Sequence, residues 1–146
     1  MLSELIRYTE VADDLAINTF LKSGKQIPEA EALFSHILNA QHIWISRIHQ
    51  VPANYERLDI HPVSHFREMH HLNIAGLKQI LETEDLDKTV RYSSSFGTFE
   101  DNISHILFQV VNHSTYHRAQ VASHFKKNGI QPPVTDFIWL QREGLL

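Results

Sequence analysis

The sequence predicts an all-α protein: a four-helix bundle with a short hairpin-like connection before the fourth long helix and a short C-terminal helix. Two observations lead to this prediction. Four stretches of roughly twenty residues carry apolar side chains at the spacing of an amphipathic helix. The segments between them are short and contain the glycines and prolines that end helices. With 146 residues, the chain suits one domain spanning residues 1–146.

The first two helices are bounded by residues typical of helix ends. Apolar side chains recur with helical spacing over residues 3–23, and Gly24 ends this first helix. The second helix begins at Pro28, because proline suits the first turn, and it ends near Gln50. Residues 53–60 are expected to form a connection.

The third helix is expected over residues 62–82, and the longest connection, residues 83–100, follows it. Within that connection, residues 89–92 alternate polar and apolar side chains, as a strand does. A serine run and Gly97 form a turn, and residues 98–99 then pair back. We therefore expect a small hairpin here.

The fourth helix starts at Asp101 or Asn102 and runs to Asn128, where Gly129 supplies a C-terminal stop. A pair of prolines then breaks the chain, and a short last helix is expected over Asp136–Arg142.

Composition excludes several classes of protein. With 42% hydrophobic and 21% charged residues, the chain can bury a core. A net charge of −4 argues against nucleic-acid partners, because phosphate binding needs a basic face. No apolar run is long enough to span a membrane, and the N-terminus has no apolar signal core. There is no cysteine, so no thiolate ligand or disulfide forms. A cytoplasmic location is the simplest interpretation.

Histidine is unusually frequent, at 11 of 146 residues. An excess of this kind favours metal binding, but it also produces pairs by chance. Two His-x-x-x-His pairs occur, His61/His65 and His113/His117. Their spacing alone does not distinguish them.

The helical wheel places one histidine of the second helix in the apolar stripe. A helix turns about 100° per residue, so His36 shares a face with apolar residues, whereas His42 and His49 leave it. The apolar residues that share this face are Leu33, Ile37, Ala40, Ile43 and Trp44. His36 is therefore the histidine of this helix that should face the core.

The fourth helix carries a polar row without charges. The row consists of Asn102, Gln109, His113, His117, Gln120 and His124, all within about 40° of His113 on the wheel. A solvent-exposed face is the alternative interpretation, but such a face normally carries Lys, Glu and Asp. The only charged side chain between Asn102 and Phe125 is Arg118, which lies on the other side. The row thus suits a cleft with restricted water.

Histidines at i and i+4 can reach one ion, so His113 and His117 form a candidate metal pair that His36 would complete from a facing helix. Imidazole suits Zn, Ni, Cu and Fe rather than Ca or Mg. Three protein ligands leave one coordination position open for water or substrate, as in catalytic sites.

The remaining polar residues have lesser predicted roles. The pair His61/His65 straddles a helix start and is interpreted as surface capping. His70 and His71 are neighbours and point about 100° apart, so they cannot form a facing pair. The groups expected to contact the metal ligands or to transfer protons are Gln109, Gln120, His105 and His124.

Three segments resemble DinB-like proteins in order and spacing. The family's second helix resembles residues 33–48, LFSHILNAQHIWISRI, in which His36 precedes Trp44 by eight residues. Its fourth-helix signature, H-x-x-x-H-R-x-Q, resembles residues 110–121, VVNHSTYHRAQV. Its closing segment resembles residues 132–140, PPVTDFIWL. The resemblance covers nearly the whole chain, and the fourth-helix motif is the most specific part.

The resemblance implies a four-helix bundle of the DinB/YfiT type. It also implies one nickel or zinc ion held by three histidines, which correspond to His36, His113 and His117. Many members carry a histidine at the position of Gln109. This chain therefore lacks whatever role that histidine has in the family.

A homodimer is also implied by the resemblance. The apolar back of the fourth helix, with Phe108 and Val111, is compatible with such a contact. The family name refers to induction by DNA damage, which does not imply contact with DNA.

Two classes of function stay open. The first is a metal-dependent enzyme acting on a small molecule, either a hydrolase or a transferase of a low-molecular-weight thiol; the resemblance implies both. A hydrolase needs a general base, and no Asp or Glu lies in the fourth-helix row, whereas a metal-activated thiol needs no strong protein base. The alternative is a non-enzymatic, stress-related bundle with a structural or sensory metal.

Overall fold

A computed structural model describes all 146 residues and contains five helices and one two-stranded antiparallel sheet. The elements in chain order are α1 (Leu2–Ser23), α2 (Pro28–His49), α3 (Val63–Thr83), β1 (Thr89–Ser94), β2 (Gly97–Asn102), α4 (Ile103–Lys127) and α5 (Phe137–Arg142). The expected helices are confirmed to within two residues at each end. The hairpin is confirmed but longer than expected, because each strand has six residues.

The helix ends follow the local chemistry of the chain. Gly24 adopts the left-handed conformation, with φ 60°, after α1, and Pro28 occupies the first turn of α2. Gln50 adopts a left-handed φ of 57° without being glycine. Its side-chain amide donates to the carbonyl oxygens of Arg47 and Arg91, at 2.6 and 3.0 Å. This residue therefore closes α2 and ties its end to β1.

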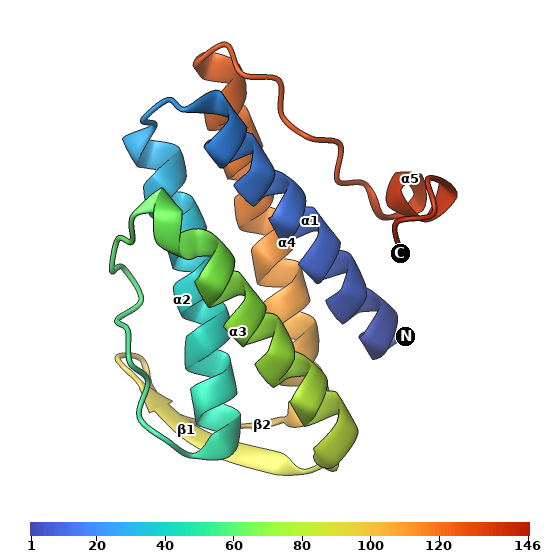
Figure 1. Cartoon of the computed structure of the whole chain (residues 1–146). Helices are drawn as coiled ribbons and strands as arrows, with labels where there is room; N and C mark the ends of the chain where they lie inside the picture. Colours follow the sequence, from blue (N-terminus) through green and yellow to red (C-terminus); the bar gives the residue numbers. More distant parts are fainter.

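Four long helices lie side by side, and the hairpin crosses one end of the group (Figure 1). Helix α1 contacts α3 and α4, and α2 contacts the same two helices, whereas β1 contacts α2 and β2 contacts α4. The last helix, α5, packs beside the start of α1, where the rings of Tyr8 and Phe137 are 5.6 Å apart. The group thus places α2 directly against α4.

The core consists of two apolar clusters separated along the helices by a buried polar layer. Asp13 of α1 is fully buried and accepts hydrogen bonds from Arg118 of α4 and Gln41 of α2, at 2.7 and 2.8 Å. Gln41 also donates to Ser114 and accepts from Asn73 of α3. All four long helices therefore contribute to this layer, which fixes how they sit against one another. No helix is both long enough and apolar enough to cross a membrane.

Candidate metal centre

Three histidines meet where α2 packs against α4. His36 of α2 and His113 and His117 of α4 are half-buried, and one ring nitrogen from each lies within 4.8 Å of the other two. The Nε2 atoms of His36 and His113 are 3.1 Å apart. The centre of the His117 ring lies 4.7 Å from the centre of the His36 ring and 4.4 Å from that of the His113 ring. The structure therefore brings together the three residues that the sequence singled out.

The donor set fits a transition-metal ion. Zinc binds imidazole nitrogen at about 2.0–2.1 Å, so two nitrogens on one tetrahedral ion are roughly 3.3 Å apart. The 3.1 Å between Nε2 of His36 and Nε2 of His113 is close to that value. Two nitrogen lone pairs this close require a proton or a cation between them. Imidazole nitrogens suit zinc, copper, iron or nickel, and three of them would leave a coordination position open.

Hydrogen bonds hold two of the rings in the tautomer that metal binding needs. The Nδ1–H of His36 donates to the carbonyl oxygen of Arg57 at 3.0 Å, and the Nδ1–H of His117 donates to Oε1 of Gln120 at 2.7 Å. A hydrogen on Nδ1 leaves the Nε2 lone pair of each ring free. The Arg57 carbonyl belongs to the segment before α3, which the buried Asn39 anchors by donating to the Asp59 carbonyl at 2.8 Å.

The surroundings of His113 and His117 favour the neutral form of both rings. Burial, followed by the neighbouring His117 and His36, lowers the pKa of His113 to about 4. The pKa of His117 is also lowered, chiefly by burial, although its hydrogen bond to Gln120 opposes the shift. Neutral imidazole is the form that binds a metal, so His113 and His117 are ready to do so at pH 7.

The four polar residues predicted to support the site have different positions. Gln120 contacts His117 directly. Gln109 lines a cavity beside the histidines but makes no hydrogen bond to them. His105 is exposed and His124 half-buried, and neither side chain bonds to the cluster. His105 and His124 each lie about two helical turns, at least 10 Å, along α4 from the nearest cluster histidine, so the structure does not bring them to the cluster, and their roles stay predictions.

Two other histidines, His42 and His61, form hydrogen bonds between α2 and the segment before α3. His61 lies outside the helix, as expected, but it does not cap α3; its Nε2 instead bonds to Oδ1 of Asn39 at 2.6 Å. His42 accepts a hydrogen bond from the backbone N–H of Asn54 at 3.0 Å. These contacts were not predicted from the sequence. The pattern that could have indicated them is the three-residue spacing of His36, Asn39 and His42, which lie along one side of α2.

A cavity of about 870 Å³ opens beside the histidines. Its wall includes His36 and His113, residues of the hairpin and residues of the segment that follows α2. The volume is within the range of small-molecule sites. Glu56, which is exposed, is the only carboxylate residue in its lining.

Comparison with known proteins gives one family. The sequence model of the DinB family matches residues 11–144, a range that includes the three histidines, the hairpin and both residues of the buried ion pair, Asp13 and Arg118. No curated protein matches the chain, and no solved structure does.

Proposed function

This chain belongs to the DinB family, and from that premise we propose that it is a metal-dependent enzyme acting on a small molecule, built as a four-helix bundle of the DinB/YfiT type. The metal is one nickel or zinc ion, and its ligands are His36, His113 and His117. The observation that carries the proposal is the 3.1 Å approach of Nε2 of His36 to Nε2 of His113. Side-chain and backbone acceptors take the Nδ1–H groups of His36 and His117, which supports the same ligand set.

The ligand set is tested by metal analysis of untagged protein. His36→Ala and His117→Ala are expected to lose most of the bound metal, because each removes one of three donors. His105→Ala is the matched control, since His105 is an exposed histidine on α4 that does not touch the cluster. Full metal retention in both cluster variants would overturn the three-histidine site.

Transfer of a low-molecular-weight thiol is the reaction that the site supports better than hydrolysis. The ion, when bound, supplies Lewis acidity that favours the thiolate form of a thiol. No Asp or Glu contacts the histidines, and the chain has no cysteine, so the thiol comes from a second molecule. In this reaction the thiol releases its proton to solvent and its sulfur forms a bond to an electrophilic carbon. The bond from that carbon to the leaving group breaks, and the leaving group departs with its electron pair. The cavity has room for both molecules.

Hydrolysis is the second candidate because Glu56 lines the cavity and is the one carboxylate there that could act as a general base. Metal-loaded protein is assayed with thiols plus electrophiles, and separately with simple esters and amides. Thiol transfer predicts turnover only in the first assay and little change in Glu56→Gln. Ester or amide turnover that falls roughly 100-fold or more in Glu56→Gln would instead identify a hydrolase.

Assembly and location are parts of the same proposal. We propose a homodimer formed through α4, supported by Phe108, whose side chain is 57% exposed on that helix. The other expected contact residue, Val111, was placed wrongly, because it is buried in the core and unavailable to a partner. A cytoplasmic location and the lack of nucleic-acid partners stay predictions from composition.

A further inference from the structure

The cavity beside the histidines continues along α2 to an arginine. His36, Ala40, Trp44 and Arg47 line it, and their spacing places them on one face of the helix. Arg47 follows His36 by eleven positions, so their Cα atoms are about 16 Å apart along the helix axis. A molecule that reaches both ends of this cavity is therefore elongated.

Two aromatic rings hold the Arg47 guanidinium. Its Cζ atom lies 4.5 Å from the centre of the Trp44 ring and 4.7 Å from that of Tyr92. The two ring centres are 5.0 Å apart and the rings are nearly perpendicular, so the guanidinium rests in the corner between them. The hydroxyl of Tyr92 donates to Oδ2 of Asp101 at 2.6 Å, which fixes one side of the corner.

No protein group accepts the hydrogens of this guanidinium. Arg7, Arg67 and Arg118 each pair with a carboxylate. Arg47 has neither an ion pair nor a side-chain hydrogen bond and is half-buried, whereas the other arginines without an ion pair (Arg57, Arg91 and Arg142) are exposed, Arg57 at the rim of the same cavity. Partial burial lowers the pKa of Arg47 from its ordinary value. A positioned cation with free donors, in the wall of a cavity that also contains the metal ligands, is a site for an anion.

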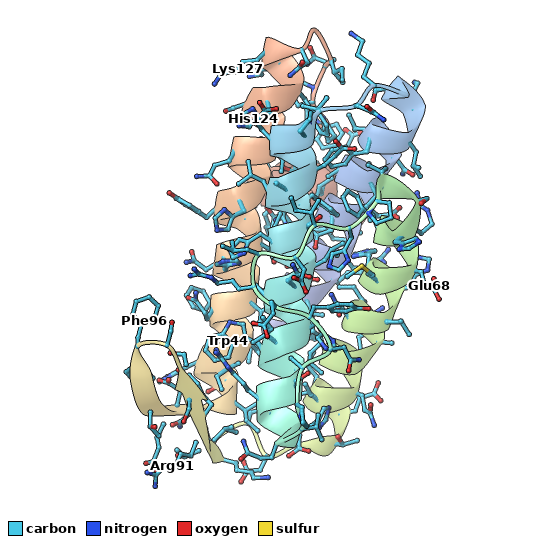
Figure 2. The ribbon with its side chains drawn as sticks, turned by 90° about the vertical axis from the view of Figure 1, so that its left-hand side faces the viewer. Trp44, Glu68, Arg91, Phe96, His124 and Lys127 are labelled. Carbon is cyan, nitrogen blue, oxygen red and sulfur yellow. The ribbon has the colours of Figure 1, made fainter.

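We propose, on the basis of the proposed function, that Arg47 binds a carboxylate of the substrate and thereby orients the reacting end of the molecule toward His36 and His113. The planar fork of a guanidinium matches a carboxylate. Apolar side chains beside it, among them Trp44 and Phe99, would contact the body of the ligand. The substrate class is an elongated carboxylate with an apolar or aromatic portion. Figure 2 shows the hairpin with Phe96 at its tip on the same side of the molecule as Trp44.

The test uses a matched pair of probes on metal-free protein, so that direct binding of the carboxylate to metal does not contribute. Trp139→Phe leaves Trp44 as the single tryptophan of the chain, and its fluorescence reports binding in the cavity. The probes are 3-phenylpropionate and the neutral 3-phenylpropanamide. We expect the acid to bind at least about tenfold more tightly than the amide, as a charge-assisted bidentate contact gives. In Arg47→Gln this preference should fall below about twofold.

The matched control is Arg91→Gln. Arg91 is adjacent to Tyr92 on β1 but points away from Trp44, at the far edge of the hairpin (Figure 2), so the preference should not change. Arg47→Lys keeps the charge without the planar fork and should lose most of the preference, which provides a second variant. Equal binding of acid and amide by the parent protein, or an unchanged preference in Arg47→Gln, would overturn the inference.

The metal content of the parent and of Arg47→Gln, measured on the proteins as purified and before the metal is removed for the binding test, separates this inference from the proposed function. Arg47→Gln should retain its metal, because Arg47 is not a ligand. Parent protein that prefers the acid but retains no metal would support the Arg47 site and contradict the metal centre. Parent protein that retains metal but binds acid and amide equally would contradict the Arg47 site and support the metal centre.

Discussion

At the scale of single residues, the partner of each Nδ1–H group determines how well a histidine binds metal. Gln120 accepts from Nδ1 of His117 at 2.7 Å. We predict that Gln120→Leu lowers metal affinity about 10- to 100-fold, because the ring loses both its fixed orientation and its preferred tautomer. Competition with a chromogenic chelator measures this affinity. Gln109→Leu is the control, since Gln109 lines the cavity without bonding to a ligand; equal losses in both variants would contradict the prediction.

The lowered pKa of His113 makes the metal-free fold sensitive to acid. Its pKa is about 4 in the folded chain and about 6.5 when unfolded, so between these values the unfolded chain binds more protons. The contribution to stability is complete above pH 6.5 and is lost as the pH falls toward 4, with a slope of about 1.4 kcal/mol per pH unit for one histidine. His70, buried with a lowered pKa, acts in the same direction.

Urea unfolding of the metal-free protein at pH 7, 6 and 5 checks this pH dependence. The parent should lose stability steadily over this range, and His113→Gln should lose less, because it lacks one of the titrating groups. His49→Gln changes an exposed histidine on α2 and serves as the control. An identical slope in the parent and in His113→Gln would show that His113 does not titrate as stated.

At the scale of elements, the buried pair Arg118–Asp13 fixes α4 against α1. Arg118 is 4% exposed and Asp13 is fully buried, and Nη1 of Arg118 lies 2.7 Å from Oδ1 of Asp13. We predict that Arg118→Met lowers the free energy of unfolding by about 3–5 kcal/mol, because it leaves a buried carboxylate without its counter-charge. Denaturant titration measures this change. Lys127→Met, exposed at the end of the same helix, should stay within about 0.5 kcal/mol of the parent.

The same helix shows what the sequence could and could not predict. Helical spacing and end residues such as Pro28 and Gly129 predicted the long helices, because these signals are local. The approach of His36 to His113 could also be predicted, because His36 lies in the apolar stripe of α2 and His113 lies in the uncharged polar row of α4. The partner of Arg118 could not be predicted, because Asp13 is 105 residues away in the sequence and no local pattern indicates the pair. The Arg57 carbonyl that orients His36 is a backbone group and has no sequence signal at all.

At the scale of the whole molecule, the exposed side of α4 bears on assembly. Phe108 is 57% exposed, although it lies on a helix whose other large apolar side chains are mostly buried. We predict that Phe108→Glu shifts the protein from dimer to monomer, because a buried unpaired charge at an interface costs several kcal/mol. Light scattering coupled to size exclusion measures the mass. Leu72→Glu, on the exposed side of α3, is the control, and a dimer that persists in Phe108→Glu would place the interface elsewhere.

The core of the molecule does not depend on the metal. The two apolar clusters and the polar layer between them connect all four long helices without any of the three clustered histidines. We predict that the chelated protein keeps its helical circular dichroism and cooperative unfolding but loses turnover. Nickel or zinc at 100 times its dissociation constant should add only about 2.7 kcal/mol, by linkage. His117→Ala should unfold like the chelated parent whether or not metal is added. Loss of helical structure on chelation would instead mean that the ion is structural, and it would favour the non-enzymatic alternative over the proposed enzyme.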